Sequence, residues 1–353
     1  MTSEQQVTSA HAPRTFDPLR NRVYRRVWSA SLVSSVGTFL QLVAAPWLMN
    51  ELTGSPFLVS AVTAALMLPR LALALPAGAL ADAIDRRTLL VGGYALGATA
   101  VSVMAVMATT EALGPASLLS LTLVLGVGSA IAQPAFHTLV PDLVPAPLRA
   151  QAITLTSAGY NVARAIGPSI GGALVAAGLT PVAFGLNALT SLGVIAVVAA
   201  LPRQAIEDRR GRGLWRAAVL GLRYVRFTPS IRVLVALAAG FAVTSACVQA
   251  LLPNVVSDEL GLGATGFGLL YGAFGAGALV GATTRDRARL ATGRAMLPGA
   301  MLAFGASGTV FGVSEIPGLS ALALATAGMT WVWALTTLNA SVQVQAPRWV
   351  RGR

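Results

Sequence analysis

The sequence predicts an all-α integral membrane protein whose chain crosses the bilayer ten times. Hydrophobic residues make up 55% of the 353 residues and charged residues only 11%, and the mean hydropathy is +0.71. Continuous apolar stretches of about 20 residues recur along the chain, and a helix of that length crosses the roughly 30 Å hydrocarbon core of a bilayer. The arginines collect in alternate segments between these stretches. One soluble core cannot bury so many apolar stretches, so a soluble globular protein is excluded.

The predicted elements follow one another with short polar segments between them. The spans lie near residues 28–50, 57–81, 89–109, 115–140, 151–178, 181–201, 231–256, 264–284, 295–313 and 318–343. Residues 1–27 are expected to form a polar cytoplasmic tail that lacks the apolar core of a signal peptide, so the first span directs insertion. Residues 28–201 form a predicted bundle of six spans. Residues 231–353 form a second bundle with four.

The linker between the two bundles, residues 202–230, is the longest polar segment. Within it, Leu214, Ala218, Leu222 and Val225 fall on one helical face, with arginines mostly on the others. This pattern favours a helix that lies on the inner membrane surface, and a plain charged linker is the alternative.

The arginines predict the orientation of the spans. The chain has 25 basic residues, all of them arginine, and 23 lie in segments that share one side of the membrane if the N-terminus is inside. The loops on the other side carry acidic residues only (Glu51, Glu111, Asp258, Glu259 and Glu315). Because cytoplasmic loops are enriched in basic residues, we expect the N-terminus to lie in the cytoplasm. The expected location of the protein is the inner membrane of the cell.

Composition also limits the kinds of function. The net charge of +12 comes from arginines scattered over several loops, so a nucleic-acid partner is not predicted. The single cysteine, Cys247, lies in an apolar stretch, which excludes a disulfide framework. His11 and His137 are far apart and show no catalytic or metal-ligand spacing. We therefore expect no enzyme, cofactor or metal site.

The loop after the second span, within GALADAIDRRTLL, joins two antiparallel neighbours. It runs from Gly78 through Asp82 to Arg86 and Arg87. Charges at helix ends are half in water, so their contacts can form and break at a cost of about 1 kcal/mol or less. The loop is thus predicted to act as a conformational latch, and an ordinary charged turn that anchors topology is the equal alternative.

An internal repeat relates the two bundles. Gly54-Ser55-Pro56 opens the second span, and Gly263-Ala264-Thr265-Gly266 opens the eighth, which also ends in a charged segment. The segment at residues 140–151 is echoed at 344–353, but only the first leads into two further spans. By this symmetry two spans are missing, and we expect a fragment or a truncated gene product.

Two motifs then resemble the major facilitator superfamily, and within it the bacterial exporters that include enterobactin exporters and macrolide efflux proteins. GALADAIDRR resembles the signature between spans 2 and 3, and RAIGPSIGGAL (164–174) resembles the antiporter signature of span 5. The resemblance implies two six-helix halves, with the last two helices missing from this chain. It also implies alternating access with the substrate between the halves, outward transport and coupling to protons.

Four residues are candidates for the substrate path. Arg70 lies twelve residues before Asp82, which places it near mid-membrane, and Arg164 is similarly deep. Such arginines face a partner or a water-filled cavity, so either could contact a polar or anionic group of the substrate or a structural partner. Gln41 and Asn161 complete the set, with interhelical hydrogen bonding as their alternative role.

Glycines predict where the halves move. Gly167, Pro168, Gly171 and Gly172 in the fifth span, and Gly275 in the eighth, would let helix backbones approach closely. In the resembled fold these spans meet across the halves, so we expect an inter-bundle seam there.

The sequence as a whole predicts a secondary transporter that exports a small molecule, either a drug or a siderophore-like compound. Its predicted partners are that molecule, the lipid bilayer and protons. A non-transporting truncated membrane protein and a membrane-bound secretion accessory are the alternatives.

Overall fold

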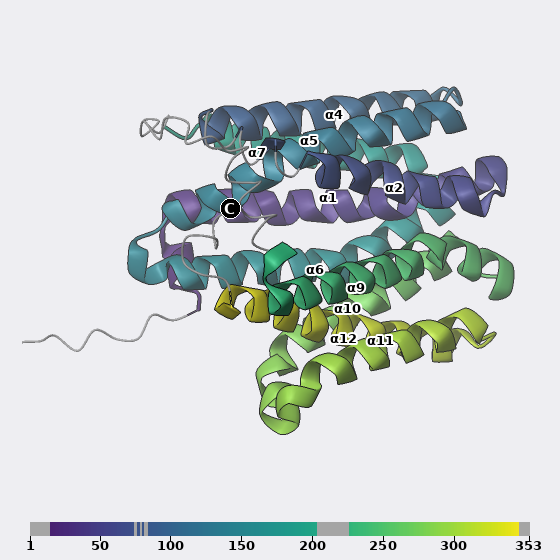
Figure 1. Cartoon of the computed structure of the whole chain (residues 1–353). Helices are drawn as coiled ribbons and strands as arrows, with labels where there is room; N and C mark the ends of the chain where they lie inside the picture. Colours follow the sequence, from purple (N-terminus) through teal and green to yellow (C-terminus); the bar gives the residue numbers. More distant parts are fainter. Residues whose placement is uncertain (1–14, 74–75, 78–79, 81–83, 203–225, 346–353) are drawn as a thin grey trace, which may run out of the picture.

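The computed structural model describes residues 15–73, 76–77, 80, 84–202 and 226–345, and this part is built from helices (Figure 1). The long helices are α1 (Arg22–Thr53), α2 (Pro56–Ala72), α4 (Arg86–Thr109), α5 (Pro115–Asp142), α6 (Arg149–Ala176), α7 (Thr180–Ala199), α9 (Pro229–Asn254), α10 (Ala264–Thr292), α11 (Met296–Val313) and α12 (Pro317–Gln345). Short helical turns join them: η1 (Asp17–Arg20), η2 (Ala146–Leu148), η3 (Val255–Glu259) and η4 (Gly293–Ala295). Each long helix coincides with one predicted span.

The length and apolarity of these helices confirm an all-α membrane fold. Among the described residues, 7 segments are long and apolar enough to cross a membrane, and one of them, 264–313, contains both α10 and α11. The described part of α2 is apolar but has 17 residues. α6 has 28 residues and is not among the 7; it carries Asn161 and Arg164 in its interior.

Capping residues set where the helices begin. The side chain of Asn21 accepts hydrogen bonds from the backbone N–H groups of Val23 and Tyr24, which starts α1. Asp85 accepts from the N–H of Thr88 in the same way and starts α4. Such caps supply partners for N–H groups that have none within the helix. The first helix therefore begins at residue 22 rather than near 28, and Arg22, Arg25 and Arg26 lie on its first turns.

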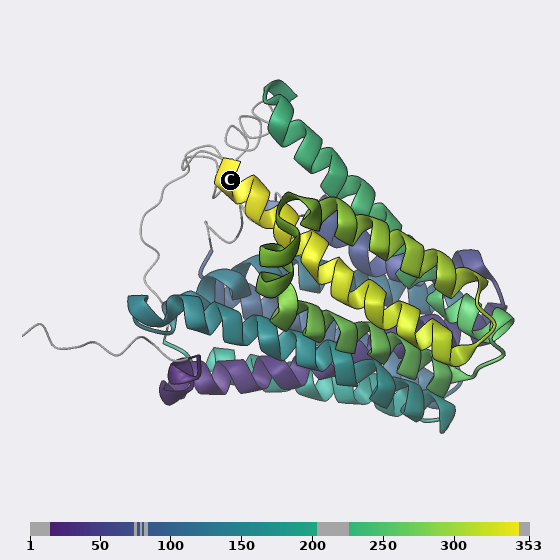
Figure 2. The same cartoon turned by 90° about the horizontal axis from the view of Figure 1, so that it is seen from below.

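The helices pack in layers around α1 (Figure 1). α4, α5 and α7 lie together on one side of α1, and α6 lies on the other, where it packs on both α1 and α10. α12 packs on both α10 and α11, and Figure 2 shows α11 and α12 side by side. The first six long helices thus form one group, and the last four approach it chiefly through α10.

Glycines allow these close approaches. A Cβ built on Gly128 of α5 would lie 3.0 Å from the backbone nitrogen of Gly97 in α4. A Cβ on Gly281 of α10 would lie 2.9 Å from the Cα of Met329 in α12. Helices in lipid associate by such packing, because the lipid gives no hydrophobic drive toward association.

Two predicted features lie outside the described residues. One is the surface helix expected near 214–227, of which only the last residues are described. The other is the first part of the charged loop, including Gly78 and Asp82.

Candidate functional site

A polar hollow of about 640 Å³ lies among the first six long helices. Its walls come from α1, α2, α4, α5, α6 and α7. On α1 the wall residues fall between 28 and 38, and on α6 between 153 and 161. The hollow therefore lies toward the end at which α1, α4 and α6 begin, which we call the arginine-rich end because Arg22, Arg86 and Arg149 are there.

Hydroxyl and amide groups give the hollow its polar character. They are Ser31, Ser34, Ser35, Thr38, Tyr94, Ser129, Gln133, Thr156, Ser157, Tyr160, Asn161, Asn187 and Ser191. On α1, Ser31, Ser35 and Thr38 recur at helical spacing and so face the same side. The Ser35 hydroxyl donates to the carbonyl of Ser31 at 2.8 Å, which satisfies that donor without a second helix. A wall of this kind can bind the polar atoms of a ligand through neutral hydrogen bonds.

Arg70 brings a permanent charge to this wall. It lies in the last turn of α2, half-buried, and its side chain lines the hollow. Its Nε atom is buried and has no hydrogen-bond partner among the described residues. Its Nη1 atom makes a long contact, 4.0 Å, to the sulfur of Met67. The structure thus places Arg70 and Asn161 at the hollow.

Gln41, the third candidate for the substrate path, lies elsewhere. Its side chain is only 4% exposed and does not line the hollow. The Nδ2 of Asn187 donates to its Oε1 at 2.7 Å, and its own Nε2 points to the sulfur of Met104 at 3.4 Å. Gln41 therefore ties α1 to α7 and α4, which is the interhelical role that its sequence left open.

Arg164, the fourth candidate, lies next to the hollow in a cage of aromatic rings. Its guanidinium carbon is 4.6 Å from the ring centre of Trp331, 5.3 Å from that of Tyr160 and 5.8 Å from that of Phe39. All three distances are within the range of a cation–π interaction. Tyr160 also lines the hollow. Because Trp331 belongs to α12, Arg164 connects the first group of helices to the last.

The backbones of the two groups approach each other closely between α6 and α10. A Cβ built on Gly172 would lie 2.7 Å from the Cα of Gly268, and a Cβ on Gly275 would lie 2.7 Å from the Cα of Ala165. Pro168 also takes part, since its carbonyl oxygen lies against Gly268. Any side chain larger than hydrogen at Gly172 or Gly268 would separate the helices.

Gly167 and Gly171 lie on a different face of α6. A Cβ on Gly171 would lie 3.0 Å from the Cα of Leu40, and a Cβ on Gly167 would meet the side chain of Phe39. Both neighbours belong to α1. The expected inter-bundle seam therefore contains Pro168, Gly172 and Gly275, whereas Gly167 and Gly171 pack within the first bundle. Successive residues on a helix point about 100° apart, so adjacent residues of α6 can pack against α1 and against α10.

At the end opposite the arginines, α1 contacts the second group directly. Trp47 stacks on Phe267, with ring centres 5.9 Å apart and planes inclined by 21°. The Nδ2 of Asn50 donates to the hydroxyl of Ser257 at 3.3 Å, and Asn254 donates to the Oδ1 of Asn50 at 3.4 Å. The two groups thus touch at this end, while the hollow lies toward the other.

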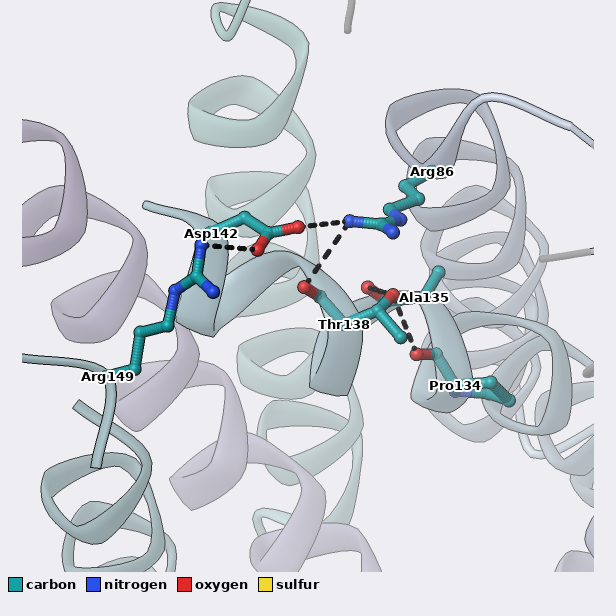
Figure 3. A network of polar contacts seen from close by, with 6 residues as sticks. All are labelled: Arg86, Pro134, Ala135, Thr138, Asp142 and Arg149. Carbon is teal, nitrogen blue, oxygen red and sulfur yellow. Dashed lines mark hydrogen bonds and ion pairs between the residues drawn. The ribbon is translucent and has the colours of Figure 1, made fainter. Parts of the chain in front are cut away.

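An ionic network lies at the arginine-rich end (Figure 3). Arg86, at the start of α4, makes an ion pair of 2.5 Å with Asp142 and a hydrogen bond of 3.5 Å to the carbonyl of Thr138. Arg149, at the start of α6, pairs with the same carboxylate at 3.5 Å. Arg87, which is half-buried, has no ion pair with a described residue. The network joins α4, α5 and α6 through one acid.

We expect Asp142→Asn to lower the free energy of unfolding by about 1 kcal/mol. The three side chains are between 30% and 51% exposed, and ion pairs of that exposure contribute little each. The loss would be measured from thermal unfolding of the purified protein in a neutral detergent. Asp286→Asn is the matched control, since Asp286 is 89% exposed and, among the described residues, forms an ion pair with its neighbour Arg285. An equal loss in both variants would contradict a structural role for the network.

Three of these residues escaped sequence reasoning. Asp142 follows the fourth span in a segment noted only as a repeat, and Trp331 and Gly268 lie in spans without any charge nearby. The spacing of Gly268, Gly272 and Gly275 on one helix was the available signal for Gly268. No local pattern distinguishes Trp331 from the other tryptophans, because its role depends on an arginine from a distant span.

Comparison with known proteins adds the family. A family model described as transmembrane secretion effector matches residues 13–353. The multidrug efflux pump Tap of Mycolicibacterium fortuitum is 28% identical over 92% of this chain and 81% of its own length. The pump of the same name from Mycobacterium tuberculosis is 30% identical, and there the match covers 56% of this chain and about half, 49%, of the relative.

Solved structures show the same fold. A bacterial homologue of the human lysosomal transporter Spinster, inward-facing and unoccupied, superimposes with a TM-score of 0.70 at 16% identity, covering 93% of this chain and 78% of the other. The nucleoside transporter NupG gives a TM-score of 0.71 at 13% identity, covering 94% and 86%. At these identities the likeness concerns the arrangement of helices alone.

Proposed function

The chain belongs to the transmembrane secretion effector family of major facilitator transporters, and from that premise we propose that it exports small molecules across the cytoplasmic membrane by alternating access. Drug-like and siderophore-like compounds are the proposed cargo. The names of the relatives, multidrug efflux pumps, support export rather than uptake.

The position of the hollow supports this proposal most directly. The two helix groups touch at one end, through Trp47 and Phe267 and through Asn50 and Ser257, and the polar hollow lies toward the other end. With the arginine-rich end in the cytoplasm, as the positive-inside rule favours, the hollow takes its ligand from the cell interior. This arrangement is the one in which an exporter loads its substrate.

Movement between the two groups then releases the ligand on the outside. The seam between α6 and α10 is the proposed pivot, because backbones in contact without side chains can slide and tilt with little steric obstruction. In the outward step the stack of Trp47 on Phe267 separates. The latch role of the loop from Gly78 to Arg87 remains part of the proposal, with Asp142 as the carboxylate that Arg86 binds.

A proton gradient is the proposed energy source. Family membership supports it, and His137 is a titratable residue at the hollow. No aspartate or glutamate occurs among the residues that line the hollow in the described part of the chain. Coupling of export to protons would therefore depend on His137, on the charged loop from Gly78 to Arg87, or on a proton carried by the substrate itself.

The test is a transport assay in a bacterial strain that lacks its major efflux pumps. Cells that express the chain should accumulate less of at least one compound from a panel of antibiotics and siderophores than cells with an empty vector. A protonophore should abolish the difference. Unchanged accumulation across both panels, with the protein present in the membrane fraction, would contradict the proposed function.

A further inference from the structure

The charges at the hollow are all of one sign. Of the residues that line it, Arg70 is permanently charged and His137 can become positive, and none that the structure describes there is acidic. A second guanidinium, that of Arg164, lies beside Tyr160, whose ring is part of the wall. The charged groups around this space therefore favour a positive electrostatic potential in it.

Among the residues that the structure describes, Arg70 lacks the partner that such a position requires. An arginine inside the membrane normally pairs with another residue or faces a water-filled space, because a bare charge in hydrocarbon is costly. Its guanidinium has five N–H donors, and the buried Nε has no acceptor among the residues that the structure describes. The thioether sulfur of Met67, 4.0 Å from Nη1, does not compensate the charge. Because the side chain of Arg70 lines the hollow, a ligand in this space can supply acceptors to the guanidinium.

A carboxylate or another oxyanion can supply the hydrogen-bond acceptors that Arg70 lacks among the described residues. The planar guanidinium binds such groups through two parallel hydrogen bonds, which are shorter and stronger than bonds between neutral groups. Neutral donors stand around the same space, among them Gln133, Asn161 and Tyr94, and they can bind further oxygen atoms of the ligand. A volume of about 640 Å³ is sufficient for a drug-sized molecule.

An organic cation meets the opposite situation. It would enter a confined space with a guanidinium and without a facing carboxylate, and the repulsion between like charges is much stronger there than in water. We propose that the hollow is a binding site for organic anions, with Arg70 as the residue that binds the acidic group. The transport of such anions rests on the proposed function, whereas their binding in the hollow does not depend on it.

Two dyes of similar ring structure and opposite charge test the proposal. Fluorescein is a dianion at mildly alkaline pH, and rhodamine 123 is a cation with the same three-ring core. Binding of each to the purified full chain in a neutral detergent is measured by fluorescence anisotropy. We expect fluorescein to bind at least about tenfold more tightly than rhodamine 123, as one charge-assisted contact would give.

Variants assign the preference to one residue. Arg70→Gln should weaken fluorescein binding about tenfold and leave rhodamine 123 binding unchanged or tighter. Arg70→Lys should retain part of the affinity for fluorescein, because it keeps the positive charge but lacks the planar guanidinium that makes two parallel hydrogen bonds. Arg289→Gln removes one positive charge from an exposed position on α10 and is the matched control. Elution as a single species in size-exclusion chromatography and an unchanged helical circular dichroism spectrum establish that the variants are folded.

Three results would overturn the proposal. They are equal or tighter binding of rhodamine 123, an unchanged ratio of the two affinities in Arg70→Gln, and no binding of either dye. Charge-selective binding in a protein that exports nothing from cells would contradict the proposed function and leave the binding site intact. Export of cationic drugs alone would leave the proposed function intact and contradict the binding site.

Discussion

Replacing Gly172 with leucine is expected to abolish export while the chain still inserts into the membrane. The Cα atoms of Gly172 and Gly268 are so close that a Cβ on either would lie within 2.8 Å of the other. Backbone cannot move aside as the end of a flexible side chain can, so α6 and α10 must separate. Overpacking of this kind costs about 1–3 kcal/mol, and about 1.4 kcal/mol already changes a conformational equilibrium tenfold.

The expected result is a loss of export of about tenfold or more, because the state with the seam closed becomes poorly populated. Accumulation of an exported compound in cells measures the loss, and the amount of protein in the membrane fraction is measured in parallel. Gly185→Leu is the matched control: Gly185 lies in α7, and a Cβ there meets nothing within 4 Å. Full export by Gly172→Leu would contradict the seam as the pivot.

The second large effect is expected at Arg164. Its guanidinium lies 4.6 Å from the ring centre of Trp331, which belongs to the other helix group, and the contact lies in a region predicted to be near mid-membrane. Desolvated cation–π contacts contribute about 2 kcal/mol, so removing either partner shifts the equilibrium between the conformations by about thirtyfold. We expect both Arg164→Gln and Trp331→Leu to reduce export by about tenfold or more.

A double-mutant cycle separates this contact from general damage. If the guanidinium and the indole act together, the variant with both changes should lose little more export than either single variant. Arg164→Lys and Trp331→Phe should retain part of the activity, because each keeps a cation or a ring. Losses that simply add in the double variant would show that the two residues act independently.

Hydropathy was sufficient to predict an all-α membrane protein. Membrane-length apolar stretches have to become helices, because a backbone in lipid must satisfy its own hydrogen bonds. The ten predicted spans therefore coincide with ten helices, and errors are confined to their ends. α1 begins at residue 22 because Asn21 caps it, and a cap depends on the local conformation of one side chain rather than on hydropathy.

The candidate site was only partly predictable, because the sequence does not say which face of a helix meets which neighbour. Arg70, Asn161 and Gln41 are all polar residues in apolar stretches, but only Arg70 and Asn161 line the hollow, whereas Gln41 is hydrogen-bonded to Asn187. Gly171 and Gly172 are adjacent and look equivalent in sequence, yet one faces α1 and the other faces α10. Such distinctions depend on the rotation of each helix about its axis, which tertiary packing decides.

The origin of the hollow's walls in one bundle has a consequence for how such a protein changes over evolutionary time. The described residues that line it belong to the first six long helices, whereas the glycine contacts between the halves lie on α6 and α10. Exchanges among the serines and threonines of the wall can therefore alter which compounds are recognised without touching the surfaces that move. Under the proposed function, selectivity and motion therefore depend on largely separate sets of positions, and a few mutations in the wall are expected to change the cargo.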